Sequence, residues 1–301
     1  MRIVMVGAGD IVRKMYLPLL AGWPGVQLVG IASRRAASSG ELARTYRIPA
    51  LPSLETGLDL HPDLVTIHTS TETHAELGVK VLERGIPLFV DKPLGYHLAD
   101  AERLLDTAKK TNTPLFVGFN RRFAPLYVQA RRHVPEPGLV MVEKHRRQRW
   151  FTDARTTLFD DFIHPLDTLV SLTGGLSGGE LVDDATAVYI RAEAGPRYTA
   201  VMHRGIGYEG ERLTLQGEPG RVEVADLEHL TAMTPNQRIT REFGSWDTVA
   251  WRRGFQAMME KVFSTLHDAN GKAGWPMSLD ELYLTHAALE ALSVYGRFDR
   301  I

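Results

Sequence analysis

The chain has 301 residues, of which 44% are hydrophobic and 24% are charged. These are the proportions of a globular protein of about two domains, and they exclude a disordered or fibrous chain. Lysine and arginine number 35 against 36 for aspartate and glutamate, and cysteine is absent. The even charge offers no overall field for a nucleic acid or a membrane surface, and the lack of cysteine excludes disulfides, thiolate nucleophiles, cysteine-ligated zinc and iron–sulfur clusters.

The N-terminal apolar run is too short for a signal peptide, because glycine and aspartate interrupt it after residue 6. A membrane-spanning helix needs about 18 consecutive apolar residues, and no such stretch occurs. We therefore expect a soluble, cytoplasmic protein that binds neither a membrane nor a nucleic acid.

Up to residue 119, short apolar runs alternate with longer segments of helical period. Expected strands are residues 3–6, 26–31, 64–67, 88–90 and 115–117, and expected helices are residues 11–20, 36–46, 73–82 and 98–108. Nearly continuous apolar strands are typical of a parallel sheet buried on both faces. The pattern predicts an α/β domain, residues 1–119, with a doubly wound parallel sheet.

From residue 120 onward the pattern changes to alternating strands with fewer helices. Expected strands are residues 139–142, 185–192, 198–203, 212–216 and 221–225, and expected helices are residues 160–172, 249–267 and 279–295. This predicts a second, α+β domain, residues 120–301, with a mostly antiparallel sheet covered by helices on one face. The uncovered face would leave an apolar patch in water, so we expect a homodimer or homotetramer assembled through this sheet.

The first expected strand leads directly into Gly7-Ala8-Gly9-Asp10-Ile11-Val12. In a dinucleotide-binding turn the first glycine permits the tight turn and the second lets the backbone approach a pyrophosphate at the helix N-terminus. Val12 stands at the third glycine position, which serves packing. Gly7, Gly9, Asp10 and Ile11 are therefore candidate cofactor residues, although glycine-rich turns also occur where a chain only needs to bend.

The second expected strand ends at Ser33-Arg34-Arg35. Enzymes that use NAD, and methyltransferases that use S-adenosylmethionine, normally place an acidic residue here to accept from ribose hydroxyls. A hydroxyl beside two guanidinium groups suits a 2′-phosphate instead, which favours NADP over NAD, with Ser33 and Arg34 as the contacts. Alternatively, both arginines are ordinary solvated loop charges.

Polar residues also follow the third and fourth expected strands. His68-Thr69-Ser70-Thr71 leads to His74, and Asp91-Lys92-Pro93 follows residue 90. Ligands bind at this carboxyl edge of an open parallel sheet, so hydroxyl groups here can line a cofactor while Lys92 faces the reacting centre. Pro93 restricts the backbone of Lys92 and thereby the direction of its ammonium group; a surface lysine in a turn is the alternative.

In the second domain, Asp160, His164 and Asp167 are spaced to share one face of a helix. A histidine between two carboxylates has its tautomer and basicity set by them, as a general base requires near neutral pH. Acidic residues near a helix start also have a purely structural explanation. An Asp/His/Asp metal site ranks third, because the sequence offers no companion ligand at a recognisable spacing.

A basic run, Lys144 to Arg149, ends the expected strand at residues 139–142. Strand alternation places Lys144 and Arg146 on one face, where they could meet an anionic substrate group, and His145 and Arg147 on the other. Most of these charges fit a solvated sheet edge equally well. A nucleic-acid surface would need more aromatic residues than Trp150 and Phe151.

Taken together, these motifs resemble the Gfo/Idh/MocA family of oxidoreductases over essentially the whole chain. The resemblance rests on Gly7-x-Gly9, on Thr69-Ser70-Thr71-x-x-His74, on Asp91-Lys92-Pro93 in place of the family's Glu-Lys-Pro, and on Asp160-x-x-x-His164. Residues 118–125, Lys144-His145-Arg146 and Asp160-Asp161 look most like the MviM-type oxidoreductases.

The resemblance implies a Rossmann domain followed by a C-terminal domain with an open, oligomerising sheet. It also implies that Lys92 hydrogen-bonds the reacting oxygen, that His164 moves its proton and that Asp160 orients the substrate. Thr69, Ser70, Thr71, His74, Asp91 and Lys92 become candidate cofactor contacts, and Lys92, Lys144, Arg146, Asp160 and His164 become candidate substrate contacts.

The expected activity is hydride transfer between NADP, or NAD, and a carbinol or carbonyl of a sugar, cyclitol or sugar acid. Two alternatives from the same family remain: a sensor that binds NADP or a sugar without turnover, and a redox-neutral, NAD-dependent glycosidase. Retention of both Lys92 and His164 argues against the sensor, which needs no proton shuttle.

Overall fold

The computed structural model describes residues 1–148, 153–268 and 274–300. Arg149, Trp150 and Phe151 of the expected basic segment lie outside these residues. The chain divides into two compact units, Met1–Gly118 and Phe119–Ile301. Among the described residues, no helix combines the length and the apolar character needed to cross a membrane.

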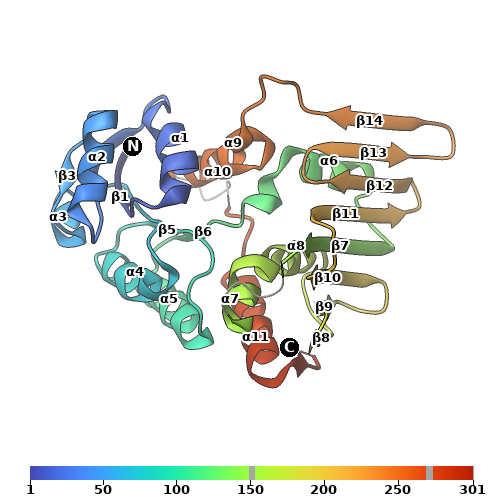
Figure 1. Ribbon diagram of the computed structural model, residues 1–301. Helices are drawn as coiled ribbons and strands as arrows, with labels where there is room; N and C mark the ends of the chain where they lie inside the picture. The colour runs from blue at the N-terminus through green and yellow to red at the C-terminus, as the bar shows by residue number, and fades with distance from the viewer. Residues whose placement is uncertain (149–152, 269–273, 301) are drawn as a thin grey trace. The chain divides into compact units, whose positions relative to one another are not determined.

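The first unit is built on a parallel sheet of six strands (Figure 1). The strands are β1 (Arg2–Val6), β2 (Gln27–Ala32), β3 (Ala50–Leu51), β4 (Leu64–Ile67), β5 (Leu88–Val90) and β6 (Leu115–Val117), in the order β3-β2-β1-β4-β5-β6. This is the strand order of the doubly wound dinucleotide-binding fold. The predicted fold class of this unit is therefore confirmed, and the sequence analysis missed the two-residue β3 and a short helix, Leu54–Leu58.

Five helices of the first unit connect these strands. They are α1 (Leu17–Ala21), α2 (Ala36–Tyr46), α3 (Leu54–Leu58), α4 (His74–Glu83) and α5 (Leu98–Thr111). A π-helical turn, Val12–Tyr16, precedes α1, and a 3₁₀ turn, Thr71–Thr73, precedes α4. The central strands are fully buried, as the continuous apolar runs predict.

The second unit contains a sheet of nine strands in the order β14-β13-β12-β11-β7-β10-β9-β8-β15. The strands are β7 (Leu139–Arg146), β8 (Gly178–Asp183), β9 (Val188–Glu193), β10 (Tyr198–Arg204), β11 (Gly210–Gly217), β12 (Gly220–Ala225), β13 (His229–Met233), β14 (Arg238–Glu242) and β15 (Arg297–Phe298). Only β7 and β10 pair in parallel among these strands of the described chain. The predicted, mostly antiparallel sheet is confirmed.

The helices of this unit are α6 (Pro125–His133), α7 (Ala154–Thr157), α8 (Ile163–Thr173), α9 (Val249–Arg252), α10 (Phe255–His267) and α11 (Leu279–Tyr295). The helix expected over residues 249–267 is broken at Gly254, which adopts φ +82°. Glycine is required there, because a Cβ would lie 2.4 Å from the Asn120 carbonyl oxygen. The helix expected from residue 160 starts with a π-helical turn, Leu158–Phe162. The strand expected from residue 185 begins at Val188, since the Asp184 carboxylate forms a turn with the backbone of Thr186 and Ala187.

One face of the large sheet is covered by helices, and the other is open. Alternate residues of β7 and β10, such as Val142 and Met202, are buried where α8 packs, and α6 contacts β12 and β13 (Figure 1). The open face is not the apolar patch that the sequence led us to expect. It carries polar and charged side chains between the apolar ones, because strand alternation puts residues such as Glu143, Arg191 and Arg212 outward.

Candidate functional site

A cleft of about 670 Å³ opens at the carboxyl edge of the parallel sheet in the first unit. Its walls come from the turn after β1, the end of β2 and the segment after β4. Of the sequence-predicted cofactor residues it is lined by Gly7, Gly9, Asp10, Ile11, Ser33, Arg34, Thr69 and Ser70. Its position is where the doubly wound fold holds a dinucleotide.

The two glycines of the first turn are required for different reasons. Gly7 adopts φ +122°, and a Cβ there would lie 2.4 Å from the carbonyl oxygen of His68, so the protein itself requires glycine. A Cβ on Gly9 would meet nothing within 4 Å. The space beside Gly9 therefore belongs to the cleft, and this open backbone suits the close approach of a pyrophosphate.

The end of β2 presents cations to the cleft. Arg34 and Arg35 are exposed there, and the Ser33 hydroxyl donates to the Arg35 carbonyl oxygen at 2.7 Å. No acidic residue stands at this strand end, which is the position that usually accepts from a ribose hydroxyl.

Lysines pair with the acidic residues of the cleft wall. Lys14 lies 2.8 Å from Asp10, and Lys80 lies 3.4 Å from Glu55 and 3.1 Å from Glu76. The Lys14 hydrogen bond lowers the pKa of Asp10. These pairs reduce the repulsion that acidic residues would exert on an anionic ligand.

His74 joins two loops at the carboxyl edge of the sheet. Its Nδ1 donates to the Pro93 carbonyl oxygen at 2.7 Å, and its Nε2 lies 3.2 Å from the Thr69 carbonyl oxygen. The ring is 1% exposed. His74 thus connects the loop after β4 to the turn that carries Lys92, and within the described residues it is not one of those that line the cleft.

Asp91 is buried beside Lys92. Its Oδ1 accepts from the Lys92 amide at 2.9 Å, and the Tyr16 hydroxyl interacts electrostatically with the same carboxylate. Burial raises the pKa of Asp91, and burial together with Asp91 raises the pKa of Tyr16 far above its usual range. Asp91 therefore fixes the backbone of the turn that carries Lys92. Neither residue lines the cleft, and Thr71 does not either, among the residues that the structure describes.

In the second unit, His164 is buried against Arg121. Arg121 Nη1 donates to His164 Nε2 at 3.2 Å. A guanidinium group can only donate, so the proton of the neutral imidazole lies on Nδ1. The expectation that Asp167 sets the tautomer was wrong, because Arg122 binds that carboxylate through Nε at 3.0 Å and Nη2 at 2.7 Å.

Glu211 holds Arg121 in place. The guanidinium forms two parallel hydrogen bonds to the carboxylate, at 3.1 and 3.0 Å, and the Tyr127 hydroxyl adds a third at 3.3 Å. Burial alone would raise the pKa of Glu211, but Arg121 outweighs it and lowers that pKa to about 2. The orientation of His164 thus depends on a buried Glu211–Arg121 pair.

Three cations converge on Asp161, which follows the predicted Asp160. Lys144 and Arg204 pair with its carboxylate, and Arg146 binds it through Nε at 3.0 Å and Nη2 at 3.2 Å. Burial would raise the pKa of Asp161, yet Lys144 and Arg146 hold it well below its usual range. Burial lowers the pKa of Lys144 to about 7. Lys144 and Arg146 share one face of β7 as predicted, but both face this internal carboxylate.

A second cavity, of about 440 Å³, lies at this cluster. It is lined by Arg146, Arg147, Gln148, Asp160, Asp161, Arg204 and Glu209. The side chain of Arg146 is 30% exposed, whereas that of Lys144 is 3% exposed. Of the two predicted basic contacts, only Arg146 reaches this cavity, and Asp160 lies with it.

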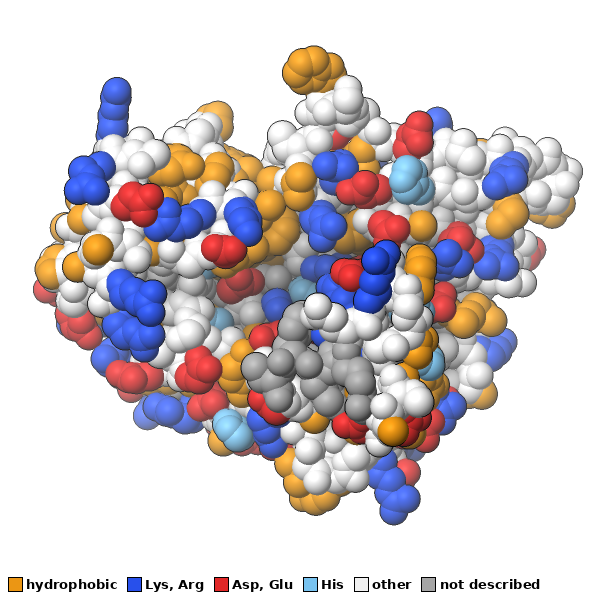
Figure 2. All heavy atoms as spheres, viewed as in Figure 1, with side chains coloured by type: hydrophobic (Ala, Val, Ile, Leu, Met, Phe, Trp, Pro, Cys, Tyr) orange, Lys and Arg blue, Asp and Glu red, His pale blue; other side chains and the backbone are white. Residues whose placement is uncertain are grey.

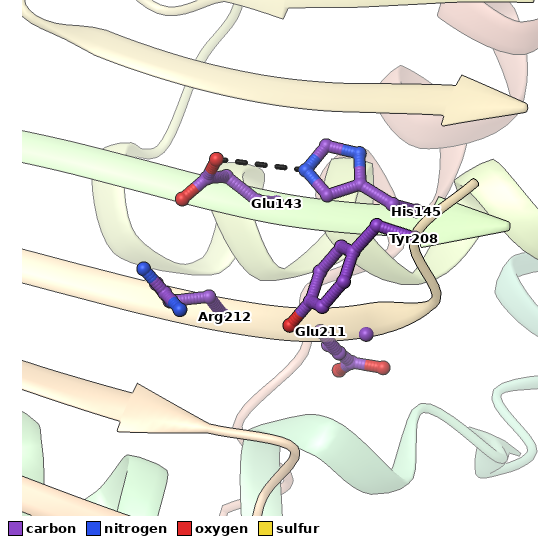
Figure 3. A pocket seen from close by; sticks show the side chains of 6 residues that line it. Glu143, His145, Tyr208, Glu211 and Arg212 are labelled. Atoms are coloured by element: carbon purple, nitrogen blue, oxygen red, sulfur yellow. Dashed lines mark ion pairs between the residues drawn. The ribbon is translucent and has the colours of Figure 1, made fainter. Parts of the chain in front are cut away.

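A smaller pocket of about 230 Å³ lies on the open side of the sheet around the ends of β7 and β11. Figure 3 shows the Glu143 and His145 side chains next to each other on β7, 3.6 Å apart, with the Tyr208 ring beside His145. None of the predicted site residues lines it.

Sequence reasoning missed Arg121, Glu211 and Arg204. Arg121 lies in the segment used for the family resemblance, so its position was noted without a role. Arg204 and Glu211 stand at strand ends far along the chain. The pairing of β7 with β10 brings Arg204 to Asp161, and the pairing of β7 with β11 brings Glu211 to Arg121.

On the side shown in Figure 2, basic and acidic side chains are interspersed and do not form a field of one sign. Within the described ranges, no three His, Asp or Glu side chains gather in a way that could hold a metal ion.

Comparison with known proteins agrees with this geometry. Residues 1–119 match the model of an oxidoreductase family with an NAD-binding Rossmann fold, and residues 125–234 match a YceM-like C-terminal domain. The chain is 33% identical over 264 residues to an oxidoreductase named YceM from Salmonella typhimurium, covering 85% of this chain and 86% of that protein.

Two solved structures resemble the whole chain. A Gfo/Idh/MocA family oxidoreductase from Vibrio cholerae is 32% identical with a TM-score of 0.84, over 97% of this chain and 96% of that one. A dehydrogenase (MviM) from Clostridium difficile is 26% identical with the same TM-score, over 97% and 98%. The resemblance inferred from the motifs is confirmed, including its MviM-type character. The chain is therefore an NAD(P)-dependent oxidoreductase of the Gfo/Idh/MocA family, with an NAD-binding Rossmann domain followed by a YceM-like C-terminal domain.

Proposed function

We propose that this oxidoreductase prefers NADP(H) and acts on a carbinol or carbonyl carbon of a small polar substrate, such as a sugar, cyclitol or sugar acid. The observation that carries the proposal is the cleft beside Gly9, whose open backbone and neighbouring cations suit a phosphorylated dinucleotide. The nicotinamide supplies the hydride acceptor or donor. A panel of polyols, sugars and sugar acids, followed at the nicotinamide absorbance band with both cofactors, tests the substrate class.

The preference for NADP rests on Ser33 and Arg34 at the end of β2. A guanidinium forms charge-assisted hydrogen bonds with a 2′-phosphate, and losing such a pair costs about 1.5–3 kcal/mol, roughly a tenfold to hundredfold loss of affinity. Titration of both cofactors against wild type and Arg34→Ala measures it. Arg44→Ala removes an exposed arginine of α2 that does not line the cleft and is the matched control.

We expect Arg34→Ala to weaken NADPH binding and to leave NADH binding nearly unchanged, with the control like wild type. Equal affinity of wild type for the two cofactors would refute the preference. An unchanged NADPH affinity in Arg34→Ala would remove Arg34 from it.

For the reaction we propose that Lys92 polarises the reacting oxygen and that His164, once its Nε2 is released from Arg121, accepts the proton of that oxygen on oxidation and returns it on reduction. Asp160 orients the substrate, and Arg146 meets an anionic substituent in the 440 Å³ cavity. Lys144 acts indirectly, because it is buried against Asp161 and helps hold that carboxylate under Arg146.

Steady-state kinetics of the single and double variants test these roles. A positioned proton-transfer group contributes about 10²–10⁴-fold, so Lys92→Met or His164→Ala should lower turnover by about that factor and leave NADPH binding intact. If both act on one oxygen, the double variant should lose much less than the product of the two factors. Asp160→Asn should raise KM more than it lowers kcat. Normal turnover in His164→Ala would show that the catalytic residue is misassigned.

We further propose that the protein works in the cytoplasm as a homodimer or homotetramer formed through the open face of the large sheet. The polar and charged residues of this face suit an interface with many ion pairs as well as apolar contacts.

A further inference from the structure

His68 is a buried histidine at the edge of the dinucleotide cleft. It directly follows β4, is 3% exposed and is one of the residues that line the cleft. Its ring stacks on Tyr16 with centroids 4.0 Å apart and lies 5.9 Å from the ring of Phe89. Its backbone is fixed as well, because its amide donates to the Val6 carbonyl oxygen at 2.7 Å.

Within the described residues, neither ring nitrogen of His68 has a hydrogen-bond partner. Burial lowers the pKa of His68 to about 3, so the ring is neutral and carries one donor and one acceptor. Buried polar groups in proteins are nearly always paired, and an unpaired one calls for an explanation. A ligand group in the cleft that donates or accepts a hydrogen bond would supply a partner for one of these nitrogens.

The strand order indicates which part of a dinucleotide that would be. The end of β2 reads the adenosine ribose, and the turn after β1 holds the pyrophosphate. Since β4 lies on the other side of β1 from β2, its end meets the second nucleotide. Tyr16, on which His68 stacks, interacts electrostatically with Asp91, and Asp91 fixes the backbone of Lys92. His68 is therefore linked through two contacts to the turn that carries the proposed catalytic lysine.

We propose that His68 is a positioning residue for the nicotinamide half of the dinucleotide, and that one nitrogen of its neutral ring forms a hydrogen bond with a ribose hydroxyl or the carboxamide of that half. Both groups can donate and accept, so either can match the ring nitrogen that it meets. The inference rests on the dinucleotide cleft of the proposed function. It assigns a task to a side chain for which the folded protein alone provides no polar partner among the described residues.

The test is binding, measured by calorimetry on the full chain with three probes. NADPH carries both halves, 2′-phospho-ADP-ribose lacks only the nicotinamide ring, and 2′,5′-ADP lacks the whole second half. His68→Phe keeps a ring against Tyr16 and removes both nitrogens. Thr66→Val is the matched control. The Thr66 hydroxyl, on β4, is also buried and has no hydrogen-bond partner among the described residues, but Thr66 does not line the cleft.

We expect His68→Phe to bind NADPH about tenfold more weakly, as the loss of a hydrogen bond predicts, and to bind 2′,5′-ADP like wild type. A matching loss for 2′-phospho-ADP-ribose would assign the contact to the ribose, and no loss would assign it to the carboxamide. Thr66→Val should bind all three probes like wild type. His68→Asn, which keeps a donor and an acceptor, should bind NADPH more tightly than His68→Phe.

Thermal melting gives a second readout. Because His68→Phe removes an unpaired buried polar group, its melting temperature without ligand should equal or exceed that of wild type, while the rise caused by NADPH should be smaller. Unchanged NADPH affinity, or an equal loss for 2′,5′-ADP, would overturn the inference and leave the proposed function standing. Failure of the wild type to bind either NADPH or NADH would overturn both.

Discussion

The buried pair of Arg122 and Asp167 gives the sharpest test of how the second unit is built. The two side chains are 4% and 1% exposed, and the guanidinium contacts the carboxylate oxygens at 2.7, 3.0 and 3.1 Å. Asp167→Asn removes the negative charge and leaves Arg122 with Glu281, at 2.6 Å, as its remaining ion-pair partner.

Breaking a buried pair from one side costs about 3–5 kcal/mol. Because Glu281 continues to compensate Arg122, we expect the lower end, about 3 kcal/mol. For a unit of this size that corresponds to a melting temperature lower by about 6–12 °C. Replacing both partners by apolar residues, Arg122→Met with Asp167→Leu, should recover most of the loss, since no charge is then left buried.

Calorimetric or circular-dichroism melts of the three proteins provide the assay. Asp10→Asn is the control, because the Asp10–Lys14 pair is exposed and a surface pair of this kind contributes little to stability. The pH dependence of turnover should not change in Asp167→Asn, since the carboxylate is engaged by Arg122 and not by His164. If Asp167→Asn is as stable as wild type, the account of the buried pair is refuted. A shifted pH profile of turnover in Asp167→Asn would instead indicate that Asp167 is the partner of His164.

Further outcomes follow from the glycine turn, the Glu211 pair and the open sheet face. Gly7→Ala should unfold at a clearly lower temperature because its Cβ would collide with the His68 carbonyl, whereas Gly9→Ala should melt like wild type and bind NADPH more weakly in calorimetry. Glu211 has a pKa lowered from 4.5 to about 2, so its stabilisation, about 3 kcal/mol, is present above pH 4.5 and is lost as the pH falls toward 2. Glu211→Gln should accordingly be less stable at pH 7 and show a flatter stability profile over that range in urea titrations. Light scattering at micromolar concentration should give a multiple of 33.6 kDa, and a mass near 33.6 kDa would contradict assembly through the sheet.

The first unit could be predicted almost completely from the sequence. Its strands are continuous apolar runs because the sheet is buried on both faces, and its cofactor turn carries local backbone requirements, as Gly7 shows. β3 was missed because two residues, Ala50 and Leu51, are too few to form a pattern.

The second unit was less predictable because its chemistry depends on strand pairing. β8, β13 and β14 expose much of their length and therefore lack a strong apolar alternation. Helical spacing put Asp160, His164 and Asp167 on one face, but the fold supplies Arg121 and Arg122 from a different segment, and these take two of the three side chains. Spacing along one helix cannot reveal partners that come from elsewhere in the chain.

The imidazole of His74 connects the loop that lines the cofactor cleft to the turn that carries Lys92. It is a rigid ring between the carbonyl oxygens of Thr69, in the wall of the cleft, and Pro93, next to Lys92. A shift of either loop therefore strains or relieves the same two contacts. If Lys92 binds the substrate as proposed, we expect His74 to couple substrate binding to cofactor binding, and by reciprocity each ligand then changes the affinity for the other by the same factor.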